Sequence, residues 1–266
     1  MEKFFISADI EGVCGVVDWS ETELDNKLGD YFKKQMTREV AAACETLSKS
    51  GVKDILVKDA HGTGRSIDPS FLPKNTKILR AWPRNPYSMM SGIDSSFGGA
   101  GFIGYHSSAG SDGNPLAHTM NGNIFEIRIN NILASEFVLN AYSAASFNVP
   151  VYFLSGDAAL CEAAKVIAPN IKTTAVSEGI GAGSISIHPD LALERISAMV
   201  KSALEMDSAK MKLTLPDSFA VSVTYKKHEQ AYRASFFPGA KKAGAHQVNI
   251  TCKTWIDVLA FIQFTF

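Results

Sequence analysis

The feature that most constrains this chain is a short apolar run that ends in chemically active residues. Residues 4–12, Phe-Phe-Ile-Ser-Ala-Asp-Ile-Glu-Gly, contain it first. Nearly continuous apolar sequence of this length is typical of a strand buried on both faces. Residues two apart in a strand point the same way, so Asp9 and Glu11 are expected to project together. Neighbouring carboxylates raise each other's pKa, so the spacing favours a cation between them, although an ordinary solvated loop is the alternative interpretation.

The same pattern recurs along the first 170 residues. Further apolar runs at 55–57 and 101–105 lead directly into Lys58-Asp59-Ala60-His61 and into His106. Helical spacing separates the runs, with helices expected at residues 31–47 and 136–147 and a third capped by Asp157 that ends before Pro169, and further strands at 78–80 and 151–154. Strands that alternate with helices predict an α/β fold with a mostly parallel, doubly wound sheet.

The pattern changes near residue 171. A glycine-rich link at 179–183 precedes an amphipathic helix at 191–206, strands at 219–224 and 247–252, and a last helix opened by Thr254. Asn130-Asn131 is expected to form a hairpin turn, because asparagine tolerates positive φ. We therefore expect an α/β domain at residues 1–170 that carries the site, and a second, smaller α/β lobe at residues 171–266.

Composition excludes several classes of partner. The 26 basic and 27 acidic residues give a net charge of −1, which favours neither nucleic acid nor an anionic membrane surface. No stretch approaches the roughly 18 apolar residues of a membrane span, and no secretory leader is expected at the start. The four cysteines are far apart and share no C-x-x-C spacing, so we expect reduced thiols in a cytoplasmic protein.

Five potential metal ligands are expected at one edge of the predicted sheet, because ligands of such sheets bind beyond the carboxyl ends of the strands. They are Asp9, Glu11, His61, His106 and Glu136. A lone strand-end histidine is more often structural, and a lone glutamate in a first helical turn usually faces the helix dipole. Three carboxylates balance two divalent cations and one hydroxide, whereas a single cation leaves the cluster anionic. The convergence of five potential ligands at one edge and the charge of the three carboxylates together predict a two-metal site.

These residues belong to segments that together resemble a known family. Residues 7–12 (Ser-Ala-Asp-Ile-Glu-Gly), 58–61 (Lys-Asp-Ala-His), 101–106 (Gly-Phe-Ile-Gly-Tyr-His), 117–120 (Ala-His-Thr-Met) and 136–142 (Glu-Phe-Val-Leu-Asn-Ala-Tyr) occur in this order. The set resembles the D-aminopeptidases of the dipeptide-transport operon type, peptidase family M55. The similarity extends along essentially the whole chain.

The resemblance implies a binuclear zinc aminopeptidase that hydrolyses short peptides, with D-amino-acid dipeptides as the expected substrates. It implies that Asp9 bridges both metals, that Glu11 and His106 complete one site, and that His61 and Glu136 complete the other. His118 matches the catalytic histidine. The resemblance further implies a homodecamer that encloses a channel. The mixed ligand set also suits Mn or Co.

Two other functions remain open from the residues alone. A two-metal phosphoesterase uses similar ligands but needs cationic groups to hold the phosphate, for which Arg65 is the nearest candidate. A metal-dependent peptide-binding protein needs the same ligands without a competent base.

Overall fold

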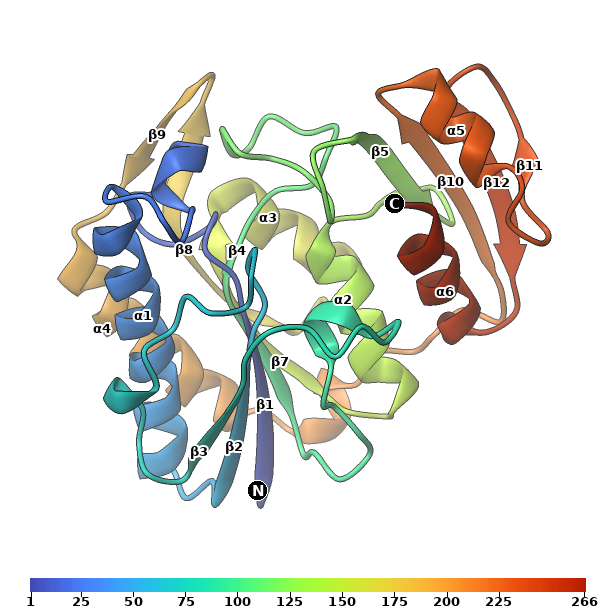
Figure 1. Ribbon diagram of the computed structural model, residues 1–266. Helices are drawn as coiled ribbons and strands as arrows, with labels where there is room; N and C mark the ends of the chain where they lie inside the picture. Colours follow the sequence, from blue (N-terminus) through green and yellow to red (C-terminus); the bar gives the residue numbers. More distant parts are fainter.

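The opening apolar run becomes an inner strand of a seven-stranded sheet in the computed structural model, which describes residues 1–266 (Figure 1). The strand order is β3-β2-β1-β4-β7-β8-β9, and only β9 runs antiparallel to its neighbour. The strands are β1 (Lys3–Ala8), β2 (Asp54–Asp59), β3 (Thr76–Leu79), β4 (Ala100–Tyr105), β7 (Val151–Asp157), β8 (Lys172–Ile180) and β9 (Gly183–Ser186). The chain reverses its winding direction between β1 and β4, so their carboxyl ends form a switch point.

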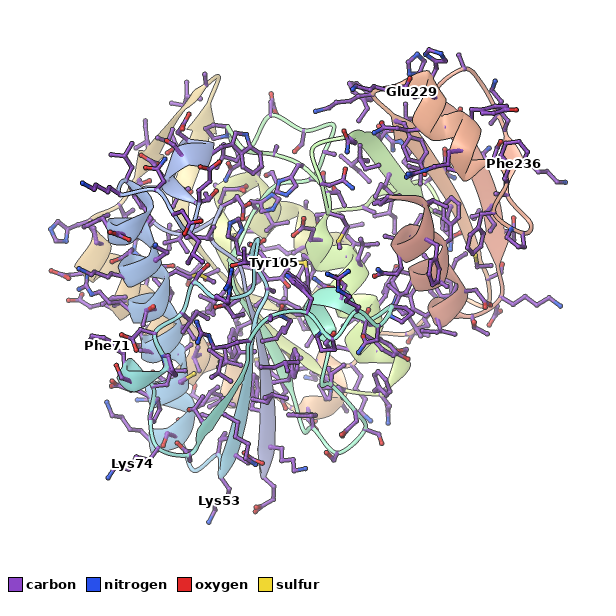
Figure 2. The ribbon with its side chains drawn as sticks, viewed as in Figure 1. Lys53, Phe71, Lys74, Tyr105, Glu229 and Phe236 are labelled. Atoms are coloured by element: carbon purple, nitrogen blue, oxygen red, sulfur yellow. The ribbon has the colours of Figure 1, made fainter.

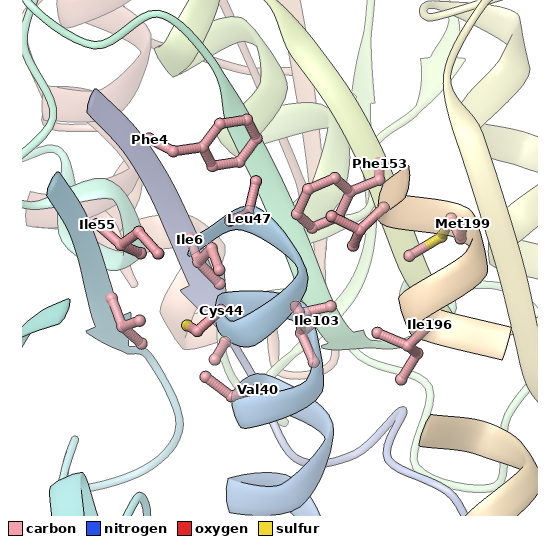
Figure 3. Close-up of a cluster of buried hydrophobic side chains, with 14 of the residues drawn as sticks. Phe4, Ile6, Val40, Cys44, Leu47, Ile55, Ile103, Phe153, Ile196 and Met199 are labelled. Carbon is pink, nitrogen blue, oxygen red and sulfur yellow. The ribbon is translucent and has the colours of Figure 1, made fainter. Parts of the chain in front are cut away.

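Helices cover both faces of this sheet, as the alternation predicted. Phe4 and Ile6 of β1 point into a core with α1 (Gly29–Lys49) and α4 (Pro189–Leu204), which Figure 3 shows. Phe5 points the other way, into a core with α2 (Glu136–Ser146) and α3 (Ala158–Ala163). Burying apolar side chains on both faces explains why β1 reads as a nearly continuous apolar run.

A second sheet is antiparallel throughout, in the order β11-β12-β10-β5-β6. Its strands are β5 (Ile124–Ile129), β6 (Ile132–Leu133), β10 (Phe219–Tyr225), β11 (Lys241–Lys242) and β12 (Gln247–Cys252). The helices α5 (His228–Ala234) and α6 (Trp255–Thr265) pack on it. The predicted turn is confirmed, because Asn130 and Asn131 have φ values of 49° and 67°.

The two sheets do not divide at residue 170. Strands β5 and β6 precede that point but belong to the second sheet, whereas β8, β9 and α4 follow it and belong to the first. The predicted glycine-rich link is the tight turn of the β8–β9 hairpin, where Gly181 has a φ of 57°. The division into an α/β domain at residues 1–170 and a smaller α/β lobe at residues 171–266 stays a prediction.

Short 3-10 helices complete the chain, and one of them contributes to the site described below. They are η1 (Trp19–Glu21), η2 (Pro69–Phe71), η3 (Ser88–Met90), η4 (Ala164–Val166) and η5 (Ser208–Met211). None of the helices combines the length and the apolar character needed to cross a membrane.

Candidate metal and catalytic site

The site lies at the switch point between β1 and β4. The backbone after β1 stays hydrogen-bonded to β4, because the amide of Asp9 donates to the carbonyl of Ile103 and that of Gly12 donates to the carbonyl of Gly104, both at 2.9 Å. Asp9 and Glu11 are buried there. Tyr105, the last residue of β4, lies near the centre of the molecule in Figure 2. The two carboxylates are therefore delivered to the edge where β4 ends in His106.

His61 contacts both carboxylates from the end of β2. Its Nδ1 lies 3.0 Å from Oε2 of Glu11 and 3.4 Å from Oδ1 of Asp9. Its Nε2 lies 3.1 Å from the carbonyl oxygen of Thr22. A carbonyl only accepts, so Nε2–H is the donor and Nδ1 is the ring nitrogen directed at the carboxylates.

His106 is held in a similar way between two carboxylates. Its Nδ1–H donates to the carbonyl of Ser107 at 2.9 Å. Its Nε2 lies 3.5 Å from oxygens of both Asp9 and Glu136, and it has no hydrogen-bond partner although it is buried. Glu136, in the first turn of α2, is held by the amide of Met120, which donates to Oε1 at 2.7 Å. A buried ring nitrogen without a partner, beside two carboxylates, is what a metal cation would satisfy.

His118 reaches the same cluster from the irregular loop after β4. Its Nδ1–H donates to the carbonyl of Leu116 at 2.9 Å, and its Nε2 lies 3.5 Å from Oε1 of Glu136. Its ring stacks on that of His106, with centroids 4.3 Å apart, and Trp19 contacts it edge-on at 5.1 Å. Unlike His106, His118 is partly exposed.

All six residues singled out in the sequence therefore meet in space. Their ligand atoms form three groups whose members lie within 4.8 Å of one another. The groups are Asp9–Glu11–His61, Asp9–His106–Glu136 and Glu11–His106–His118. Asp9, Glu11 and His106 each belong to two of these groups, so the three groups overlap in one cluster.

The charges of the cluster strongly perturb its titration. Burial raises the pKa of Asp9 well above its usual value, and the carboxylate of Glu11 adds to the effect. Burial opposes protonation of His61 and His106, but Glu11 and Glu136 outweigh it and raise the two pKa values to about 11 and about 10. Burial would also raise the pKa of Glu136, but His106 lowers it to about 2. The carboxylates thus attract positive charge strongly.

A buried hydrogen-bond network that the sequence analysis did not identify supports the loop of His118. Asp157, at the end of β7, accepts from the amide of Ser107 at 2.6 Å and from its hydroxyl at 2.5 Å. The amide group of Asn114 donates to the carbonyl of Glu11 at 3.1 Å and lies 3.4 Å from Asp157. Asp157 follows an apolar run as Asp9 does, and that pattern was the available signal.

A cavity of about 280 Å³ opens over the cluster. Asp9, Glu11, His61, His118 and Glu136 line it on one side, and its apolar lining consists of Trp19, Ala60, Trp82, Met89 and Met120. No lysine or arginine lines it. Arg65 instead lines a separate groove of about 690 Å³ between α1 and η2.

Comparison with known proteins agrees with this geometry. The family model of peptidase M55, described as D-aminopeptidase, matches residues 2–264. The chain belongs to this family. The M55 family is a family of peptide hydrolases, so the chain is assigned to the peptide-hydrolase class.

Two relatives of this M55 chain are from Bacillus subtilis. A D-aminopeptidase of strain 168 is 29% identical over 259 residues, which cover 96% of this chain and 93% of the relative. The solved structure of the Zn-dependent D-aminopeptidase DppA, described as a self-compartmentalizing protease, superposes with a TM-score of 0.91. That match has 26% identity and covers 99% of this chain and 96% of the other. The α/β fold with a mostly parallel sheet is confirmed.

Proposed function

We propose that this chain is a binuclear, metal-dependent aminopeptidase that removes the amino-terminal residue from short peptides, with D-amino-acid dipeptides as the preferred substrates. The observation that carries the proposal is the meeting of three carboxylates and three histidines at one cavity. The zinc dependence of the superposed relative and the D-aminopeptidase description of both relatives support the choice of metal and substrate.

The chemistry of the donor set fits two divalent ions. Each histidine donates one ring N–H to a backbone carbonyl, which directs the other ring nitrogen toward the carboxylates. A metal cation between these nitrogens and the carboxylates would replace the protons that the rings of His61 and His106 otherwise hold, and the unpartnered Nε2 of His106 is the clearest case. We propose Asp9 as the bridging ligand. The resemblance implies Glu11 and His106 for one ion and His61 and Glu136 for the other, whereas the ligand atoms group Glu11 with His61 and His106 with Glu136. We therefore propose the second pairing.

Two zinc ions in this site would polarise the peptide carbonyl and make water nucleophilic near neutral pH. The chain itself supplies orientation and proton transfer. The stack on His106 and the bond to Leu116 fix the His118 ring with its Nε2 toward the cavity. Burial and the neighbouring His106 lower the pKa of His118, so the ring is neutral at pH 7 and suited to exchange a proton with the leaving amine.

The cavity does not favour phosphoesters. A phosphate needs cationic donors, yet no lysine or arginine lines the cavity and Arg65 lies in the other groove. We also propose that the protein forms a closed homo-oligomer, a decamer by family resemblance, which the self-compartmentalizing relative supports. A peptide-binding protein without turnover is the remaining alternative, and the proposed base His118 argues against it.

Turnover assays test the proposal directly. Protein reconstituted with Zn, Mn or Co is incubated with D- and L-dipeptides, with the same peptides blocked at the amino terminus, and with a phosphoester. We expect release of the free amino-terminal residue from unblocked dipeptides alone, with metal analysis giving two ions per chain. Equal cleavage of blocked peptides, phosphoester cleavage, or indifference to chelator would overturn it.

A further inference from the structure

The apolar side of the cavity contains an aromatic wall that the reaction chemistry leaves unexplained. Trp82 follows β3 on an irregular segment and is only partly buried, and it lines the cavity together with Met89 and Met120. Its indole N–H donates to the carbonyl of Gly62 at 2.8 Å, directly after His61. The ring is therefore fixed relative to the end of β2.

The ammonium group of a buried lysine contacts the ring of Trp82. Lys58 of β2 has no exposed surface, and its Nζ lies 3.9 Å from the centre of the Trp82 ring. The same ammonium donates to the carbonyls of Asp59 at 2.5 Å and Ala81 at 2.8 Å. Ala81, directly before Trp82, has a φ of 58°, which is unfavourable for alanine. The lysine thus joins the strand end before His61 to the strained segment that carries Trp82.

Burying the ammonium group of Lys58 costs free energy, so its presence here calls for a functional reason. Removing an ammonium from water is unfavourable, and a cation–π contact together with two hydrogen bonds offsets only part of that cost. A Lys58 whose role was only to fill space between strands would be replaceable by an apolar residue. Here the ammonium lies against the ring of Trp82, a residue that also lines the cavity.

We propose that Trp82, fixed by Lys58, is the wall that binds the side chain of the substrate's amino-terminal residue and selects uncharged, apolar side chains. An acidic side chain would find no lysine or arginine in the lining with which to pair. A basic side chain would meet an indole ring that already has an ammonium group 3.9 Å from its centre. This inference rests on the proposed peptidase function, and it assigns Trp82 to specificity and Lys58 to positioning.

The test compares zinc-reconstituted wild type with Trp82→Ala, Trp82→Phe, Lys58→Met and Lys58→Arg. Binding of glycinamide and of both enantiomers of leucinamide and lysinamide is measured by calorimetry with each variant combined with His118→Ala, which suppresses hydrolysis of the amides, and kcat and KM are measured on the matching dipeptides with His118 intact. Phe71→Ala, an exposed aromatic of η2 outside this cavity, is the control.

We expect wild type to prefer leucine over glycine, and Trp82→Ala to reduce this preference about tenfold, mainly through KM. Trp82→Phe should retain part of the preference for leucine. This variant also tests the proposal if Trp82→Ala folds poorly. Lys58→Met should weaken the binding of leucinamide and raise the affinity for lysinamide relative to that for leucinamide. Lys58→Arg keeps the positive charge and should keep the wild-type order of affinities. If Lys58 had only a structural role, Lys58→Met would not change the order of affinities for the three side chains.

The inference is overturned if wild type shows no preference for leucine over glycine, or if Trp82→Ala leaves the preference unchanged. Its failure is distinguishable from failure of the proposed function, because binding of the amides needs no turnover. If the protein hydrolysed no dipeptide but Trp82→Ala still reduced the preference for leucinamide, the proposed function would fail and the side-chain pocket would still hold.

Discussion

The rings of His106 and His118 lie parallel, with centroids 4.3 Å apart and an angle of 10° between their planes. Both donate Nδ1–H to a backbone carbonyl, so both direct Nε2 toward Glu136. Their surroundings differ, because His106 lies between two carboxylates whereas His118 is partly exposed and contacts Trp19. This difference supports a ligand role for the first and a proton-transfer role for the second.

Replacing His118 with Ala should reduce kcat by roughly 10²- to 10⁴-fold, the usual contribution of a general acid or base. The zinc content should stay at two ions per chain, because the ring is not among the five proposed ligands. Metal analysis and steady-state kinetics on one preparation measure both. His228→Ala removes an exposed histidine and is the control. Near-normal rates, or the loss of one zinc, would show that His118 has a different role.

Zinc should stabilise the fold, and Asp9→Asn should remove that effect. Burial and Glu11 raise the pKa of Asp9, so its ionised form destabilises the metal-free protein. We expect chelated Asp9→Asn to melt at or above the temperature of chelated wild type, whereas only wild type gains stability on zinc addition. Calorimetric melting curves measure this. A zinc-induced rise in Tm that is equal in both proteins would contradict a bridging Asp9.

Asp157→Asn should reduce both stability and kcat. The carboxylate accepts hydrogen bonds from the amides of Ser107 and Leu160, and an Asn side chain would turn a donor toward one of these amides. We expect a loss of about 2 to 3 kcal/mol in urea unfolding, and a lower kcat because the Ser107 end of the His118 loop is released. Ser111→Ala, on the same loop, is the control. Wild-type kcat in a destabilised variant would show that the network only supports the fold.

The convergence of the proposed ligands was predictable from the sequence, because it follows from the rule that parallel strands end at the same edge of a sheet. Asp9, Glu11 and His106 follow two strands of a mostly parallel sheet, and such strands end at one edge. The position of His118 was not predictable from local pattern, because its irregular loop is placed by long-range hydrogen bonds of Asn114 and Asp157. Only the family resemblance indicated this residue.

The assignment of strands to the two sheets also depends on long-range contacts. The β5–β6 hairpin was correctly predicted as a hairpin, but its partner β10 lies almost 100 residues later. The β8–β9 hairpin instead joins the first sheet, where β8 pairs with the preceding strand β7. Alternation of apolar residues indicates that a strand exists and which residues share a face, but it does not indicate which sheet the strand joins.

Glu39 should make stability depend on pH. It is buried on α1, where Oε1 accepts from the amide of Cys14 and Oε2 has no partner, and burial raises its pKa to about 7. The folded state therefore holds a proton that the unfolded state loses near pH 4.5, so this contribution to stability is lost as pH rises from about 4.5 to 7. Relative to wild type, Glu39→Gln should gain roughly 2 to 3 kcal/mol over that range.

Urea unfolding of both proteins from pH 5 to 8 measures this difference. Metal release at low pH affects both proteins equally and cancels in the comparison. Glu45→Gln, an exposed carboxylate on the same helix, should show no such trend. A constant difference between wild type and Glu39→Gln would contradict the raised pKa.

Gly12→Ala should separate the two strand ends that form the site. A Cβ at Gly12 would lie 1.7 Å from the carbonyl oxygen of Tyr105, so the backbone after β1 would have to move away from β4. That movement would break the hydrogen bond from Gly12 to Gly104 and carry Glu11 away from His106. We expect a loss of at least about 3 kcal/mol in the free energy of unfolding, together with weakened zinc binding.

Urea unfolding and zinc titration of the purified variant measure the two effects separately. Gly244→Ala is the matched control, because a Cβ there has no neighbour closer than 3.8 Å. If Gly12→Ala bound two zinc ions with wild-type affinity and unfolded like wild type, close contact between the ends of β1 and β4 would not be what assembles the site. Loss of stability with intact zinc binding would place the role of Gly12 in packing alone.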